Sequence, residues 1–425
     1  MNFGSNQTIY YLIIAAALFC FVETSERSMA DQTSQLEWSS LPEHIILRIL
    51  SYLSLQEKYH ASLTCKMWHT CFNMPELWRK FSFWFYTPSQ KRFLRCVEQF
   101  GAFLQSIYIE LDQEVKGNRE NACTVLESMA ETSSRSLSAI SIKFTGENPL
   151  FYAGHEFVKA LRVLFGPVNL DDGFGHPTTH LLSIDLSGLT VQFDDSLLHV
   201  ISQNNYNLER LNIQNSVIIC KVSPDGLLNL VKSCKRLRDL RVYHCSMSES
   251  VLLELCAEAR EPIEHLSIKC RREDKFKIEL PSTAWSMLVR KSPKLHVTLG
   301  FDHTCPLDRV ADLLDPEIPV RVLLFETFSE IYKELNLAVK YYSSHLEKLV
   351  LNTHNSTELS GALRNVGQHC SKLKTLWVYC VLDKELIEEL LDHFPEMCKR
   401  KSYILKSEME PEPWLPGFIE EFQDL

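Results

Sequence analysis

An apolar-x-x-apolar-x-apolar pattern recurs along most of the chain. The last two apolar positions of each copy are two residues apart, and on a strand such residues lie on the same face. A stretch with helical spacing of apolar residues follows most copies, for example residues 224–234 and 383–394. The pattern therefore predicts short strands that alternate with helices. In chain order, the copies are Leu104, Ile107 and Ile109; Leu137, Ile140 and Ile142; Leu181, Ile184 and Leu186; Leu208, Leu211 and Ile213; Leu237, Leu240 and Val242; Ile263, Leu266 and Ile268; a weaker one at Val297 and Leu299; Val320, Leu323 and Phe325; Leu346, Leu349 and Leu351; and Leu373, Leu376 and Val378.

These copies return with a period of mostly about 26 to 29 residues, which lies within the range of leucine-rich repeats. One such unit cannot bury its apolar face alone, whereas stacked units share a continuous core. The sequence thus predicts an α/β fold, an irregular leucine-rich-repeat solenoid with a curved parallel sheet and outer helices. Phe81–Phe85 predicts a joining strand, and residues 166–177 and 271–278 are expected to be surface loops.

The segment Ser40–Trp78 predicts a small all-α module in front of the repeats. Its first helix has a broad apolar face. Because about 40 residues seldom bury enough surface to fold alone, part of that face is expected to contact a partner or the next domain. Pro42 lies in the first turn, where a missing N–H has no cost. Three pairs have the spacing of a helix cap, namely Ser40 with Glu43, Ser54 with Glu57, and Asn73 with Glu76.

The same segment resembles an F-box. The resemblance rests on Leu41-Pro42, the Ile/Leu run, Leu53, Ala61-Ser62, Cys65-Lys66, Trp68 and Leu77-Trp78. In that family the motif is a short helical module that docks on a Skp-type adaptor and so joins a cullin–RING ubiquitin ligase. The alternative is a plain helical hairpin that caps a larger domain. The adaptor-binding residues implied by the resemblance are Leu41, Pro42, Ile45, Ile46, Ile49, Leu50 and Leu53.

Two later repeats carry a cysteine before and after the strand, Cys234 and Cys245 in one, Cys370 and Cys380 in the other. They are similar to the cysteine-containing repeats of F-box leucine-rich-repeat proteins. The expected organisation is therefore an N-terminal apolar segment and polar linker, an F-box, a leucine-rich-repeat solenoid, and an acidic tail rich in Pro and aromatic residues. The corresponding ranges are 1–35, 36–82, 83–403 and 404–425.

Composition narrows the classes of function. The 425 residues carry a net charge of −10, which argues against nucleic-acid binding, because that needs clustered Lys and Arg. The 14 cysteines form no Cys-x-x-Cys pair and are expected to be buried in a reducing compartment. No phosphate-binding Gly loop, His-Glu-x-x-His helix or Gly-x-Ser-x-Gly elbow occurs. We therefore expect no catalytic residue, no metal site and no cofactor, and hence no enzyme.

The apolar segment at residues 9–22 is not typical of an intracellular protein. Residues 9–22 are uninterrupted apolar residues, a run that is short for a membrane span and lacks the preceding Lys or Arg of a signal peptide. Our hypothesis is that Met29 is the working start and that the protein is cytoplasmic or nuclear. One alternative is a short membrane anchor, with the protein facing the cytosol. Another is a secreted or membrane-tethered leucine-rich-repeat binding protein, which a glycan at Asn355 would support.

The expected function is substrate recognition for a Skp–cullin–F-box ubiquitin ligase, since the resemblance implies that the F-box docks the adaptor and the repeats hold a protein substrate. Other subunits would catalyse ubiquitin transfer, which proximity of the substrate accelerates. A non-degradative scaffold, bound to the adaptor without a cullin, is the alternative.

Strand positions that alternate with the core are expected to line the concave face of the solenoid. The late repeats place aromatic and aliphatic residues there, and an exposed row of this kind is typical of a binding hot spot. The tail is expected to cap the last repeat, to reach into a partner, or to cover this row. Arg210, Arg241 and Lys269 form either a phosphate-reading site or a solvated basic stripe. The candidate substrate-binding residues are Tyr243, Leu324, Val350, Trp377, Tyr379, Arg241 and Lys269.

Overall fold

The computed structural model describes residues 41–132, 136–146, 154–167, 181–217, 219–272 and 278–408. The apolar segment 9–22, Met29, Ser40 and the tail beyond residue 408 lie outside these ranges, as do most of the two expected surface loops. No helix in the described ranges is both long enough and apolar enough to cross a membrane.

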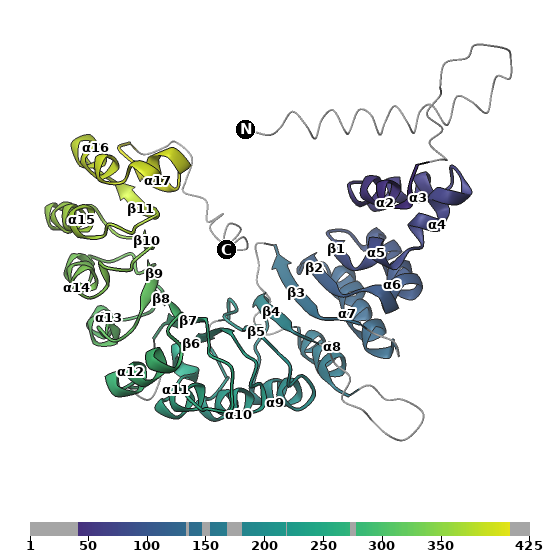
Figure 1. Cartoon of the computed structure of the whole chain (residues 1–425), viewed down its shortest axis with the longest axis horizontal. Coiled ribbons are helices and arrows are strands. Elements are labelled where there is room, and N and C mark those ends of the chain that lie inside the picture. The colour runs from purple at the N-terminus through teal and green to yellow at the C-terminus, as the bar shows by residue number, and fades with distance from the viewer. Residues whose placement is uncertain are drawn as a thin grey trace, which may run out of the picture.

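Twelve strands within the described residues form one parallel sheet in which each strand pairs with the next along the chain. Figure 1 shows the result as an arc, with the strands on the inner side and the helices on the outer side. This is the predicted leucine-rich-repeat solenoid. The strands are β1 (Lys80–Phe85), β2 (Ser106–Asp112), β3 (Ala139–Thr145), β4 (Ser183–Gly188), β5 (Arg210–Asn212), β6 (Asp239–Tyr243), β7 (His265–Cys270), β8 (His296–Phe301), β9 (Val320–Phe325), β10 (Lys348–Leu351), β11 (Thr375–Val381) and β12 (Tyr403–Lys406).

The helices divide into an N-terminal group and an outer row. The N-terminal group contains α2 (Glu43–Ser51), α3 (Leu55–Ser62), α4 (Lys66–Phe72) and α5 (Pro75–Trp78), which stand at one end of the arc (Figure 1). The outer row contains α6 (Leu94–Phe100), α7 (Lys116–Glu131), α8 (His155–Phe165), α9 (Asp195–Asn204), α10 (Pro224–Ser233), α11 (Glu249–Leu255), α12 (Ser282–Lys291), α13 (Leu307–Leu313), α14 (Tyr332–Tyr342), α15 (Thr357–His369), α16 (Lys384–His393) and α17 (Pro395–Arg400). Short 3-10 turns are η2 (Pro88–Phe93), η3 (Gly101–Phe103) and η4 (His244–Ser246).

The recurring apolar positions form the continuous core between sheet and helices. The middle position of most copies lies in register with that of the next, as in the pairs Ile107 with Ile140 and Ile184 with Leu211. Every position of the predicted pattern is buried. The weak copy at Val297 and Leu299 also forms a full strand, and a register shift beside Val297 accommodates it. The pattern missed only β12, whose residues are half-buried.

A backbone ladder ties the helical group to the repeats. The carbonyl of Arg79, directly after α5, accepts hydrogen bonds from the N–H groups of Gln105 and Ser106, both at 2.8 Å. The carbonyl of Gln105 accepts in the same way from Ser138 and Ala139. The first coil of the solenoid therefore starts inside the helical group, and the two parts form one continuous structure.

The cap predictions have three different outcomes. Ser54 and Glu57 form the expected reciprocal cap, since the Glu57 N–H donates to Ser54 Oγ and the Ser54 N–H donates to the Glu57 carboxylate. The prediction for Asn73 is wrong, because α5 begins after Met74 with Pro75 in its first turn. Asn73 instead ends α4 and donates to the His69 carbonyl. Pro42, not Ser40, occupies the N-cap position of α2.

Candidate functional site

The helical module is built around Trp78. Its indole is fully buried, donates from Nε1 to the Phe72 carbonyl at 2.5 Å, and stacks on the Phe100 ring with centroids 3.9 Å apart. Phe100 belongs to α6, the first outer helix of the solenoid. Part of the apolar face of the module is thus completed by the next domain, as expected. The module core comprises Ile46, Leu50, Leu53, Trp68, Cys71, Phe72, Leu77, Trp78, Cys96 and Phe100.

Helix α2 and the two residues that follow it, Tyr52 and Leu53, carry two apolar stripes that differ by one position. Ile46, Leu50 and Leu53 are spaced i, i+4 and i+7 and point into the module core. Ile45, Ile49 and Tyr52 have the same spacing, and of these Ile45 and Tyr52 are exposed while Ile49 is half-buried. Adjacent stripes lie about 100° apart on a helix, so one faces the core and the other faces outward.

The seven residues implied as adaptor contacts therefore occupy two environments. Leu41, Pro42, Ile45 and Ile49 are accessible or half-buried, whereas Ile46, Leu50 and Leu53 are buried in the module itself. Sequence reasoning missed four further exposed apolar side chains on the module, Tyr52, Tyr59, Leu63 and Met67.

The concave face contains the predicted row in continuous register. Tyr243 pairs with Lys269, and the row continues through Gly300 and Leu324 to Val350 and Trp377. The prediction that the late residues of this row are exposed is wrong for Val350 and Trp377, which are 4% and 9% exposed. The Lys348 ammonium lies 3.8 Å from the centroid of the Trp377 ring. Leu324 and Tyr379 are half-buried.

The remaining candidates are engaged inside the molecule. The Tyr243 hydroxyl donates to the Asn215 carbonyl, and the Arg271 guanidinium lies 3.8 Å above the Tyr243 ring. Burial raises the pKa of the Tyr243 hydroxyl. Lys269 forms an ion pair with Glu326 at 3.0 Å. The role of these residues in substrate binding stays a prediction.

Asp239 organises the first charged part of the face. Its carboxylate accepts from both Nε and Nη2 of Arg241, at 3.1 and 3.0 Å, and lies 3.1 Å from His265 Nδ1. Burial opposes the charge, but the hydrogen bonds from His265 and Arg241 hold the pKa of Asp239 at about 2. A groove of about 210 Å³ lies over β3–β6 beside this carboxylate, with Lys143, Asp185 and Arg210 in its lining. Arg241 is thus paired with Asp239, and whether Arg210, Arg241 and Lys269 read a phosphate or form a solvated basic stripe stays a prediction.

Exposed aromatic residues occur at the opposite end of the strand face from the predicted row. Trp84 is 39% exposed and alternates with the buried Phe83 and Phe85 on β1. Its ring packs edge-on against Tyr108 of β2, with centroids 5.6 Å apart. The signal in the sequence was the Phe-Ser-Phe-Trp-Phe segment, in which every second residue belongs to the core.

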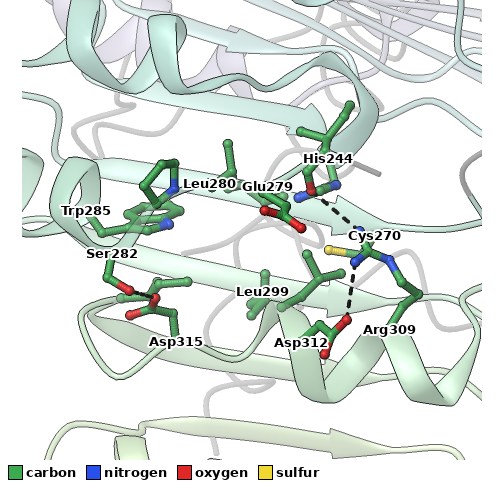
Figure 2. Close-up of a pocket in the computed structure, with 15 residues that line it drawn as sticks. His244, Cys270, Glu279, Leu280, Ser282, Trp285, Leu299, Arg309, Asp312 and Asp315 are labelled. Atoms are coloured by element: carbon green, nitrogen blue, oxygen red, sulfur yellow. Dashed lines mark hydrogen bonds and ion pairs between the residues drawn. The ribbon is translucent and has the colours of Figure 1, made fainter. Parts of the chain in front are cut away.

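A separate cavity of about 410 Å³ lies between the sheet and helices α12 and α13. Figure 2 shows Arg309 beside Asp312 and Ser282 beside Asp315 at its edge. The first pair is an ion pair at 3.5 Å, and in the second Ser282 Oγ donates to the carboxylate. The lining includes Ile278, which follows in the sequence the residues 273–277 that lie outside the described ranges. Arg309, Asp312 and Asp315 in the lining are therefore already engaged in contacts within the protein.

Fold and module together define a class of protein, a leucine-rich-repeat solenoid that carries a small helical module at its N-terminal end. The F-box-like family model matches residues 38–84, which include all of α2–α5 and nearly all of β1. Human F-box/LRR-repeat protein 8 is 26% identical over 380 residues, covering 89% of this chain and 98% of that protein. Cattle F-box/LRR-repeat protein 21 is 28% identical over 397 residues, covering 90% of this chain and 85% of that protein. The chain carries an F-box-like domain and is homologous to F-box/LRR-repeat proteins over most of its length.

Proposed function

We propose that this protein is the substrate-recognition subunit of a Skp–cullin–F-box ubiquitin ligase. The F-box docks a Skp-type adaptor, the strand face of the solenoid holds the substrate, and other subunits catalyse ubiquitin transfer. The observation that carries the proposal is the outward apolar stripe of α2, within a domain that matches the F-box-like family model.

The exposed apolar side chains are concentrated in the module. Five large ones, Ile45, Tyr52, Tyr59, Leu63 and Met67, lie within a segment of α2–α4, against eight in the rest of the described chain. A cluster of this kind marks an interaction site, whereas single exposed apolar residues are ordinary. We assign the adaptor contact to Leu41, Pro42, Ile45 and Ile49, with Tyr52 beside them. Ile46, Leu50 and Leu53 support the helix from inside.

The test is Ile45→Glu in the full chain, with recombinant Skp-type adaptor as the binding partner. A buried charge at the centre of an interface typically costs about 2 kcal/mol or more, so the Kd should rise roughly thirtyfold. Leu253→Glu on α11 is the matched control, because Leu253 is 40% exposed and Ile45 is 39% exposed. The control should bind the adaptor like the wild type.

Equal affinity of Ile45→Glu and Leu253→Glu would exclude the stripe as the contact. No binding by the wild-type chain would exclude the proposal as a whole. Capture of the adaptor without the cullin would instead support a non-degradative scaffold. Leu50→Glu is not a suitable variant, because Leu50 is fully buried and its replacement would unfold the module.

For the substrate, we propose the strand face over β1–β6, where Trp84 is exposed and the groove beside Asp239 opens. Arg241, Lys269, Leu324 and Tyr379 extend this face toward the late repeats. Ubiquitination targets captured by the wild type under proteasome inhibition should be lost from Trp84→Ala, which retains the adaptor. An unchanged set of targets would exclude the early strands as the main contact.

A further inference from the structure

Two cysteines from neighbouring coils meet at the rim of the sheet. Cys220 follows β5, Cys245 lies in η4 after β6, and the two strands pair in parallel. Ser246 Oγ donates to the Val222 carbonyl at 2.8 Å, which holds the two segments together. Cys220 Sγ lies 3.5 Å from Ser246 Oγ, and the thiols of Cys220 and Cys245 are hydrogen-bonded to each other. Both cysteines are partly exposed.

The hydrogen bond between the two thiols shifts their pKa values in opposite directions. The hydrogen bond from Cys245 lowers the pKa of Cys220 to about 6, with help from Ser246, the Val222 backbone and the charge of Arg271, and against the effect of burial. The same hydrogen bond, together with burial, raises the pKa of Cys245. The direction of both shifts favours ionisation of Cys220 before Cys245, with the Cys245 thiol as the hydrogen-bond donor.

Other cysteines of the solenoid behave differently. Burial raises the pKa of Cys370 and Cys380 to about 11 and that of Cys234 to about 12. Such thiols are protonated at neutral pH and inert, because the thiolate is the reactive species. Cys234, Cys370 and Cys380 belong to the repeat pattern, whereas Cys220 lies outside it.

We propose that Cys220 and Cys245 form a peroxide-reactive dithiol, in which Cys220 is oxidised first and Cys245 then closes a disulfide between two coils. The inference is independent of the proposed function. In a reducing compartment such disulfides are transient and redox-sensing, not structural.

The chemistry uses hydrogen peroxide as the oxidant. The Cys220 thiolate attacks one peroxide oxygen, the O–O bond breaks, and the leaving hydroxide takes a proton to become water. Sulfur is now a sulfenic acid, S–OH. The Cys245 sulfur then attacks the Cys220 sulfur, the S–O bond breaks, and the departing hydroxide leaves as water with the thiol proton. Two thiols and one peroxide thus give one disulfide and two waters.

A metal site is the competing use of two adjacent thiols. Structural zinc takes four ligands from Cys, His, Asp or Glu. In the described part of the chain, no three such side chains are placed to hold a metal ion. The geometry therefore favours oxidation over metal binding.

The first test measures alkylation of the wild-type chain by iodoacetamide between pH 5 and 9, with each site quantified by mass spectrometry. The rate at Cys220 should rise with an inflection near pH 6. At pH 6 its advantage over an ordinary cysteine should be about twentyfold, because a larger thiolate fraction outweighs the lower nucleophilicity of a weakly basic thiolate. Cys256, whose pKa burial raises, is the internal control. An inflection above pH 8 at Cys220 would overturn the proposal.

The second test adds a threefold excess of hydrogen peroxide and maps tryptic peptides. A disulfide should link the peptides 211–221 and 242–260, and fragmentation should assign it to Cys245 and not to Cys256. Cys245→Ala should lose the link and accumulate sulfenic acid at Cys220, detected with dimedone, whereas Cys256→Ala should keep the link. An unlinked wild type, or a link through Cys256, would contradict the assignment.

Discussion

The helical module and the strand face of the solenoid differ in how far their side chains are engaged within the protein. The module leaves Ile45, Tyr52 and Leu63 exposed with no apolar surface of its own to cover them. The strand face pairs its charges internally, Arg241 with Asp239 and Lys269 with Glu326. The module thus offers exposed apolar side chains, while a ligand of the face must exchange existing ion pairs. Exposed ion pairs contribute little each, so binding to the face needs many contacts.

The largest expected effect separates the core of the module from its outer stripe. Trp78→Ala removes the indole that stacks on Phe100 and the hydrogen bond to the Phe72 carbonyl. Loss of a fully buried aromatic side chain should lower the free energy of unfolding by about 3–5 kcal/mol. Urea denaturation followed by circular dichroism measures it.

Trp84→Ala is the matched control for this change, because Trp84 is a tryptophan six residues further on that is 39% exposed. It should lower the free energy of unfolding by less than about 1.5 kcal/mol, since the Trp84 side chain is only partly buried and loses less apolar contact than a fully buried one. Equal losses for the two variants would mean that Trp78 does not anchor the module to the solenoid.

A smaller effect tests the internal pairing of the strand face. Asp239→Asn removes the carboxylate that binds Arg241 and His265. The folded pKa of Asp239 is about 2, below the unfolded value of about 3.9. The ionised carboxylate therefore stabilises the folded state fully above about pH 4, and this stabilisation is lost as pH falls from about 4 to about 2. After allowance for partial exposure, it contributes about 1–2 kcal/mol to the free energy of unfolding.

The measurement compares the urea midpoints of wild type and Asp239→Asn from pH 6 down to pH 3. The difference between the two should shrink as pH falls. Asp383→Asn, at an exposed position before α16, should show little difference at any pH. If the difference in urea midpoint between wild type and Asp239→Asn stays constant with pH, the negative charge of Asp239 does not stabilise the folded state.

The same contrast explains what the sequence could predict. Apolar spacing located strands β1–β11, because a buried position needs an apolar residue and its spacing is visible in the sequence. It missed β12, since Tyr403–Lys406 has no buried residue and therefore no such constraint. The F-box motif was recognisable for the same reason, as Trp78, Leu77 and Trp68 are core residues.

The candidate binding sites were harder to predict from the spacing of apolar residues. Period-two alternation placed Val350 and Trp377 on the strand face, and their register with Leu324 confirms the shared row. It could not show that both are buried, because that depends on contacts such as the Lys348 ammonium over the Trp377 ring. The pairing of Cys220 with Cys245 likewise depends on how two loops meet, which spacing within one repeat does not describe.

The smallest expected effect returns to the module. Ser54→Ala removes the hydroxyl that accepts from the Glu57 N–H at 3.4 Å at the start of α3. Loss of an N-cap side chain costs about 1 kcal/mol, whereas Ser54→Gly should cost only a few tenths. Because the Ser54 side chain caps α3 and does not belong to the Ile45 stripe, adaptor affinity should change far less than with Ile45→Glu. Thermal unfolding and adaptor titration of both variants separate the two quantities. A thirtyfold loss of affinity in Ser54→Ala would mean that the contact depends on the whole helical hairpin and not on the outward face of α2.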